Sequence, residues 1–356
     1  MKYFSLKILK IFLAISISIL LTYISFREVE LSKIYRLVLG AEYLYVMATL
    51  ITILIAQILR SIRLGVMLHP IQPLSQKILF PISAIGFMLI VLLPARIGEL
   101  ARPYLLYQNS KINMSTAMAT IVLERILDTI FLLIFFGIIV INLELPSWVL
   151  QGAVFILIAI TVLIVSLFLA KLRWINKYFK LFMHKVLPET IAFYVENAMK
   201  GFYDGMAITR NRLQTLTIIY LTACIWGVFV LSNLLLFRAF HLQLGSLAAL
   251  TTLTLTAIGI AVPAAPGFIG NFHFFCMLGL TMFGINKNIA LSYAIVNHAL
   301  IVLTFTSLGI ICINILGINV SKFPKIFTQF RAETLQTGTS ASSHICRKNT
   351  EPSCSI

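Results

Sequence analysis

Long apolar runs separated by short polar stretches fill most of the chain. Six of these runs predict membrane spans, because a helix needs about 20 apolar residues to cross the hydrocarbon core of a bilayer. The predicted spans lie near residues 6–26, 42–60, 118–143, 149–170, 215–237 and 289–316. Two further apolar regions, 78–110 and 246–283, are too long for one helix and are interrupted by proline and glycine. The pattern predicts an all-α, polytopic integral membrane protein with about eight hydrophobic segments.

The two interruptions share a short motif. Pro-x-x-Ile-Gly occurs at Pro94–Gly98 and again at Pro266–Gly270, about two-thirds of the way through each half of the chain. Broken hydrophobic segments at matching places in two halves point to a transporter's binding site. Backbone groups freed inside lipid must find protein, water or a ligand, so we expect the breaks to line a polar cavity. The residues expected to shape the turns are Pro94, Gly98, Pro263, Pro266, Gly267 and Gly270.

Basic residues set the expected orientation. The stretch 171–214 carries eight Lys and Arg residues and 144–151 carries none, so the first is expected in the cytoplasm and the second outside. The N-terminus and the C-terminal tail are expected in the cytoplasm as well. Counting crossings from there, region 78–110 enters and leaves on the cytoplasmic side and region 246–283 on the outer side. Each is then a re-entrant hairpin, or alternatively a pair of crossing helices.

The same order of elements then appears twice. Residues 1–145 give two spans, a hairpin and a span, and 149–316 repeat this order upside down, because an odd number of spans inverts the second copy. The alternative to an inverted repeat is a chance match of three identities in five positions. Residues 1–316 form the predicted membrane domain, with 171–214 as an amphipathic connector on the inner leaflet. The polar tail 317–356 is predicted to be disordered.

Composition agrees with a membrane protein. Hydrophobic residues make up 60% of the 356 residues and charged residues only 11%, against about 25% in soluble domains. The net charge of +16 does not indicate nucleic acid, because the basic residues flank apolar runs and suit anionic lipid headgroups. The sequence carries no recognisable metal, cofactor or catalytic motif, so we expect no cofactor and no enzymatic activity. The expected partner is a membrane phospholipid or lipid-linked substrate, with a separate lipid-modifying enzyme as a further candidate.

Charged residues inside apolar sequence are costly in lipid and mark function or pairing. The first group is Arg96, Glu99 and Arg102, spaced in threes, so a helix beginning near Gly98 would clamp one carboxylate between two guanidiniums. The positive charge left over suits an anionic headgroup or phosphate, which arginine binds with two hydrogen bonds. The alternatives are an ion network that only holds the hairpin together, or a cluster at the membrane surface.

The second charged group is Glu124, Arg125 and Asp128. Glu124 and Asp128 are four residues apart and share one helix face. Counting about 20 residues back from the end of their span puts the group near the cytoplasmic side. Pairing with Arg96 or Arg102 is expected, and the alternative is a solvated helix start.

The second break is nearly uncharged and offers Asn271 and His273. Together with Asn297 and His298 of the last span, these side chains could bind a headgroup or relay protons. The alternative is ordinary hydrogen bonding within the protein. The small polar residues at 252–259 follow helical spacing and indicate close helix packing.

Three motifs resemble those of a known family. The segment Leu93–Arg102, the element Glu124-Arg125-x-x-Asp128 and the motif Pro263-x-x-Pro266-Gly267-x-x-Gly270 are similar, in sequence and order, to the signature of the flippase-like membrane domain. That domain forms the transmembrane region of lysylphosphatidylglycerol synthases and also occurs as a stand-alone protein, the UPF0104 group.

The resemblance implies a multi-span lipid-handling protein. The acyltransferase-like domain of the synthases is not recognisable, so we expect this chain not to aminoacylate lipid itself. Asn271-Phe272-His273 departs from the many relatives that carry an acidic residue nearby, which bears on the headgroup charge preferred.

These features predict a translocator that moves an anionic, aminoacylated or glycosylated lipid between the leaflets of the cytoplasmic membrane. The residues expected to bind the substrate are Arg96, Glu99, Arg102, Glu124, Arg125, Asp128, Asn271 and His273. One alternative is an intramembrane enzyme with Glu99, His273 and His298 as acid–base groups. Others are an accessory subunit of lipid or glycan synthesis, or a partner-binding scaffold.

Overall fold

The structure, a computed structural model, is made of helices throughout the part that it describes. It describes residues 15–27, 29–93, 98–110, 112–147, 149–152, 154–155, 158, 211–261 and 265–318. Three of the described helices are long and apolar enough to cross a membrane: α3 (Tyr43–Leu68), α10 (Arg212–Ala239) and α13 (Lys287–Leu316). A fourth long helix, α6 (Met114–Asn142), has 29 residues and includes the charged residues of the second group. The predicted all-α membrane architecture is confirmed at this level.

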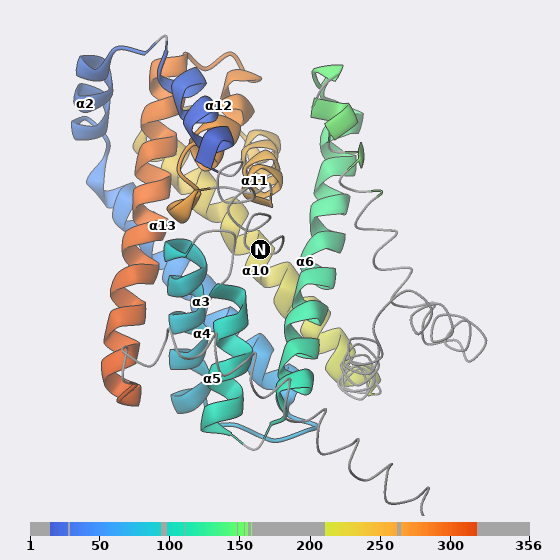
Figure 1. Cartoon of the computed structure of the whole chain (residues 1–356). Coiled ribbons are helices and arrows are strands. Elements are labelled where there is room, and N and C mark those ends of the chain that lie inside the picture. The colour runs from blue at the N-terminus through green and yellow to red at the C-terminus, as the bar shows by residue number, and fades with distance from the viewer. Residues whose placement is uncertain are drawn as a thin grey trace, which may run out of the picture.

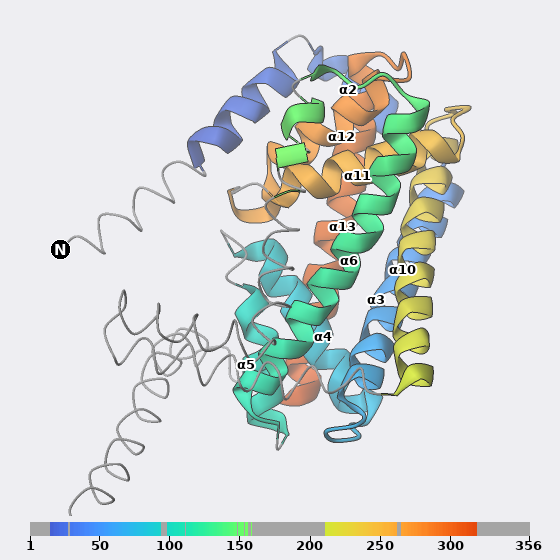
Figure 2. The same cartoon turned by 90° about the vertical axis from the view of Figure 1, so that its right-hand side faces the viewer.

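Shorter helices complete the described part of the chain. They are Ile15–Phe26, α2 (Leu31–Leu39), α4 (Gln76–Leu92), α5 (Ala101–Asn109), α11 (Ser246–Ala261), the short 3-10 turn η3 (Pro266–Phe268) and α12 (Asn271–Thr281). Figure 1 shows α4 and α5 together at one end of the bundle and α11 and α12 at the other, with α3, α6, α10 and α13 running between the ends. Figure 2 shows the same arrangement from a second side.

Two helices differ from the sequence prediction. The span predicted at 42–60 continues to Leu68 as α3, because Arg60 and Arg63 lie inside the helix among partners from other helices and do not flank it. Helix α2 is not predicted by the hydropathy pattern. The predicted span 149–170 beyond residue 158, the connector up to residue 210 and the tail beyond residue 318 lie outside the described residues.

Both helix breaks occur where the sequence predicts them. Helix α4 ends at Leu92, and Leu93 is extended with φ −94° and ψ 141°. Ala265, which precedes Pro266, is extended as well, with φ −60° and ψ 164°. Proline disfavours the helical conformation in the residue before it, so the first break begins at a residue that cannot easily continue a helix, and the second, which follows the end of α11 at Ala261, contains one. Pro94 and Pro263 themselves lie outside the described residues.

Glycine and the first helix shape the second break. Gly267 and Gly270 have φ values of +73° and +86°, in a region that side chains rarely adopt. A Cβ on Gly270 would overlap the carbonyl oxygen of Ser18, in the helix Ile15–Phe26. The hydroxyl of Ser18 also accepts a hydrogen bond from the Ala265 amide at 2.8 Å. The first helix therefore packs directly on a break that lies far away in sequence.

An apolar cluster lies between the two breaks, and we call it the central apolar cluster. Its buried members are Ile53, Phe87, Ile90, Val91 and Phe305, with Phe268, Leu300, Ile301 and Val302 packed against them. It thus joins the last turn of α4, just before the first break, to Phe268 in the second. The sequence predicts a polar cavity here, but the described side chains that join the breaks are apolar. The polar groups lie on either side of this cluster.

Helices α11 and α12 approach each other closely. A Cβ on Gly279 would lie 2.7 Å from the Cα of Thr252, and one on Gly259 would overlap the ring of Phe275. Small residues allow such contacts between membrane helices. The close packing predicted from the spacing at 252–259 is confirmed.

We expect Gly279→Val to lower the thermal unfolding temperature of the detergent-purified protein, because overpacking costs about 1–3 kcal/mol. Gly137→Val is the matched control, since no heavy atom outside its own helix backbone lies within 4 Å of a Cβ at Gly137. The remaining folded fraction is measured by size-exclusion chromatography after heating. Equal unfolding temperatures for the two variants would contradict the close approach of α11 and α12.

Candidate functional site

Charged side chains from α5 and α6 meet inside the helix bundle. Arg102 donates two hydrogen bonds to Glu124, from Nη1 to Oε2 at 2.7 Å and from Nη2 to Oε1 at 3.2 Å. Both side chains are 1% exposed. This two-pronged geometry is the strongest way for arginine to bind a carboxylate. The pairing of Glu124 with Arg102, one of two arginines that the sequence offers, is present, and Glu124 is not at a solvated helix start.

Arg63 of α3 holds both carboxylates of α6. Its Nη1 donates to Asp128 Oδ1 at 2.9 Å and to the Thr222 hydroxyl of α10 at 3.1 Å. Its Nη2 lies 3.9 Å from Glu124 Oε1. Arg125 lies 3.7 Å from Asp128 Oδ2, at the more exposed edge of the group. One network therefore ties α3, α5, α6 and α10 together.

Arg102 pairs with a different carboxylate from the one that its local spacing predicts. Arg102 turns to Glu124 because α5 packs on α6, and a carboxylate buried there without a partner would be very costly. Glu124 is thus held between Arg102 and Arg63, two residues that the local spacing does not connect. Glu99 lies half-buried in the short turn before α5, and Arg96 lies outside the described residues.

Gly86 of α4 makes room for this arrangement. A Cβ at Gly86 would overlap the Cγ of Arg102 and lie 2.6 Å from its Cδ. The aliphatic stem of Arg102 therefore crosses α4 at a point where the helix has no side chain. Arg102, which follows the first break in sequence, is therefore positioned by α4, the helix before that break.

Arg60 of α3 is surrounded by aromatic rings. Its guanidinium carbon lies 4.2 Å from the ring centre of Phe87, 4.8 Å from that of Phe229 and 5.9 Å from that of Phe305. Arg102 faces Phe87 as well, at 5.2 Å. Phe87 and Phe305 belong to the central apolar cluster, where their rings stack at 5.6 Å. Arg60 therefore reaches from the charged group to the edge of the apolar one.

We call these residues the arginine cluster: Arg60, Arg63, Arg102 and Arg125 with Glu124 and Asp128. These six residues comprise four guanidiniums and two carboxylates, an excess of two positive charges; three of the guanidiniums pair with the carboxylates and Arg60 lies over rings. The Nε atoms of Arg63, Arg102 and Arg125 are buried and, within the described residues, find no acceptor. Buried donors without a partner favour water or a polar ligand.

Sequence reasoning missed Arg60 and Arg63 as members of the site. Both lie at the end of the span predicted at 42–60, where basic residues are typical of a cytoplasmic flank. One signal was available, because Leu64, Met67 and Leu68 extend the apolar pattern past both arginines, and all three side chains are fully buried.

Two histidines hold the second break. The carbonyl of Gly267 can only accept, so His298 Nε2 donates to it, at 2.6 Å. The Gly270 amide donates to His273 Nδ1 at 3.5 Å, which is a long hydrogen bond. The two imidazole rings contact each other edge to face, with their centres 4.8 Å apart. The histidines therefore fasten the two glycines whose φ values are positive.

Asn271 joins three helices at the second break. It is fully buried; its Nδ2 donates to the Gly259 carbonyl at 3.1 Å, and its Oδ1 accepts from Ser18 at 3.3 Å. Both ends of this amide are therefore bound by protein groups. Of the predicted site residues, the structure brings Arg102, Glu124, Arg125 and Asp128 into one cluster and places Asn271 and His273 in a second group, across the central apolar cluster.

Comparison with known proteins gives the family. A family model described as the lysylphosphatidylglycerol synthase TM region matches residues 11–309. The chain belongs to this family. A UPF0104 membrane protein of Methanothermobacter thermautotrophicus is 23% identical over 303 residues, which cover 79% of this chain and 88% of that relative. No solved structure matches the chain.

The family match includes both breaks and every member of the arginine cluster. It confirms the resemblance that three short motifs indicate, and with the long apolar helices it makes the chain an integral membrane protein. The family is the membrane region of a lipid-modifying protein, which places this chain in lipid metabolism or lipid movement.

We expect Glu124→Gln to lower the free energy of unfolding by about 3–5 kcal/mol, because breaking a buried ion pair leaves a charge without a partner. Arg125→Gln should cost less than about 1 kcal/mol, since the Arg125 side chain is 37% exposed. Both are measured by equilibrium unfolding in mixed detergent micelles. Adding Arg102→Met to Glu124→Gln should recover part of the loss, and equal losses for the two single variants would contradict the pairing.

Proposed function

We propose that this chain moves an anionic lipid, or a lipid-linked anionic headgroup, between the leaflets of the cytoplasmic membrane. The arginine cluster carries the proposal, because it holds two more guanidiniums than carboxylates among long apolar helices, with Arg60 and Arg125 partly exposed. Charge inside a membrane protein is costly and marks substrate pathways. The two carboxylates of the cluster balance only two of its four guanidiniums, so an anion is a natural further partner. Membership in the membrane region of a lipid synthase family supports a lipid as the carrier of that anion.

The three groups suggest a path for the headgroup. It would bind at the arginine cluster, pass the central apolar cluster when the two breaks move apart, and leave at the second break. The acyl chains would stay in the bilayer, so only the polar head needs a hydrated route. In this scheme, the central apolar cluster is the barrier that separates the two leaflets.

The proposal includes an inverted repeat with six full spans and two re-entrant hairpins, α4–α5 and α11–α12. Helix α4 packs on α13 of the other half, while α11 packs on α6 of the first half. Helices α3 and α10, which hold equivalent places in the two halves, pack on each other. Such exchanged contacts are what a two-fold axis in the membrane plane produces.

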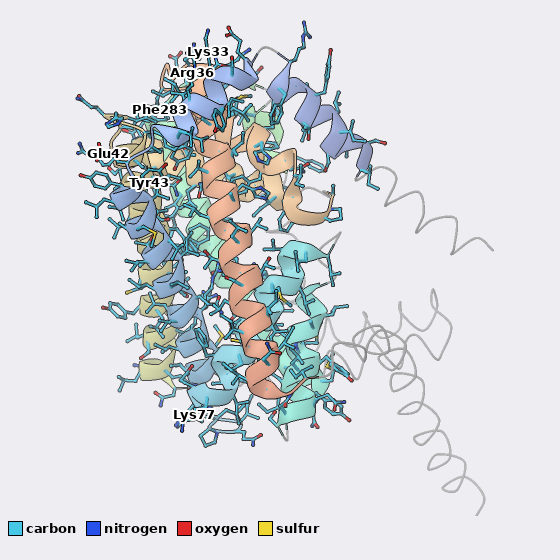
Figure 3. All side chains as sticks on the ribbon, turned by 90° about the vertical axis from the view of Figure 1, so that its left-hand side faces the viewer. Lys33, Arg36, Glu42, Tyr43, Lys77 and Phe283 are labelled. Carbon is cyan, nitrogen blue, oxygen red and sulfur yellow. The ribbon has the colours of Figure 1, made fainter. Side chains whose placement is uncertain are left out.

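An orientation with Lys77 in the cytoplasm and Lys33 outside follows from the distribution of basic loops. Figure 3 shows these two side chains at opposite ends of the molecule. In a cysteine-free background, Lys33→Cys should react with a membrane-impermeant maleimide in intact cells, and Lys77→Cys only after permeabilisation. The opposite labelling pattern would show that the orientation is inverted.

Lipid movement is tested with the full-length protein in liposomes that contain headgroup-labelled fluorescent lipids of several classes. We expect an added reductant to quench the inner-leaflet label of at least one anionic class faster than in empty vesicles. Vesicles with an unrelated multi-span protein control for leakage. If no class changes leaflet faster than in these controls, the proposed function fails.

An intramembrane enzyme is a second candidate because His273 and His298 lie in ring contact at the second break. Such a pair could exchange a proton with a lipid headgroup. Mass spectrometry of lipids incubated with the purified protein decides between the two candidates. A chemically altered lipid without faster movement between leaflets would favour the enzyme.

A further inference from the structure

Arg60 differs from the other arginines of the cluster in its partners. Each of the other three forms an ion pair with Glu124 or Asp128. In the part of the chain that the structure describes, no carboxylate is paired with Arg60. Its guanidinium lies instead over the rings of Phe87, Phe229 and Phe305.

Ring faces satisfy the charge of a guanidinium only in part. They attract the cation, but they offer no lone pairs to its five N–H donors. A phosphate group offers several oxygens whose spacing matches the arginine fork, and it binds more strongly than a ring face. An oxyanion would therefore satisfy the hydrogen-bond donors of Arg60 better than the rings do.

Replacing the ring contacts of Arg60 by a phosphate would affect the central apolar cluster. Its guanidinium lies over Phe87 and within 5.9 Å of the Phe305 ring centre, and these two rings stack in the central apolar cluster. An anion bound to the Arg60 guanidinium would replace its contacts with the rings of Phe87 and Phe305. Phosphate binding would then loosen the contact that separates the two polar groups.

Resting on the proposed function, we infer that Arg60 binds the phosphate of the lipid headgroup, and that this phosphate replaces the ring contacts of Arg60. The excess of two positive charges in the arginine cluster suits an anionic phosphodiester. Arg63, Arg102 and Arg125 keep their carboxylates and provide the positive surroundings. The ligand class is a phosphate group carried by a lipid.

The test measures binding to the purified full-length protein in detergent by isothermal titration calorimetry. The probes are dihexanoyl-phosphatidylglycerol, dihexanoylglycerol, which lacks the phosphate, and inorganic phosphate. We expect the wild type to bind the phospholipid more tightly than the other two probes. Arg60→Gln should weaken phospholipid binding about ten-fold or more, the value of hydrogen bonds between charged groups.

Two further variants separate binding from folding. Arg238→Gln removes the same charge from an exposed place on α10 and should leave binding unchanged. Phe229→Leu removes one ring that competes for Arg60, so it should tighten phospholipid binding by about two- to ten-fold. A purely structural Arg60 would not produce this gain.

Each outcome decides the inference. Equal phospholipid binding by wild type and Arg60→Gln would overturn it, and so would weaker binding by Phe229→Leu. If dihexanoylglycerol binds as tightly as the phospholipid, the phosphate is not what Arg60 recognises. If inorganic phosphate binds as tightly as the phospholipid, the lipid is not part of the ligand. Leaflet exchange by the same preparations is measured separately, so Arg60 can fail as the phosphate ligand while lipid movement stands.

Discussion

Two guanidiniums hold one carboxylate, Glu124, where the protein leaves it almost no contact with solvent. A charge in such a place must be paired or the helices around it separate. Arg102 follows the first break in sequence, and its stem crosses α4 at Gly86, so its bond to Glu124 fixes how the chain resumes after the break. Arg63 extends the same constraint to α3 and α10. This one carboxylate therefore stands at the centre of a network that connects α3, α5, α6 and α10.

The two breaks share proline and glycine in the sequence but differ in their side-chain partners. Both interrupt apolar segments at corresponding places in the two halves, although the positive φ values of Gly267 and Gly270 are not shared by Gly98. Around the first break the partners are ionic. Around the second they are hydrogen bonds that His298 and Asn271 donate to backbone carbonyls and that Ser18 accepts from the Ala265 amide. A substrate would therefore meet strong attraction on one side and weak attraction on the other, as release requires.

Local sequence patterns predicted those features of the fold that neighbouring residues determine. Proline predicted both breaks, and small-residue spacing predicted the packing of α11 on α12. The hydropathy pattern could not place Arg60 and Arg63. An arginine near the end of an apolar run can flank the membrane or be buried in the protein, and side chains from other helices decide which. Arg63 finds Asp128 and Thr222 across 65 and 159 positions of sequence. For the same reason, local spacing did not predict that Arg102 pairs with Glu124, 22 positions away in the sequence.

The bond between Ser18 and the second break reaches across 247 positions, from the first helix to Ala265. A ribosome delivers that helix to the membrane long before residue 265 exists. Until then Ser18 cannot form this hydrogen bond. The packing of α3 on α10 and of α4 on α13 likewise requires helices that are synthesised later. The contacts between the two halves therefore form only after the last helix has been made.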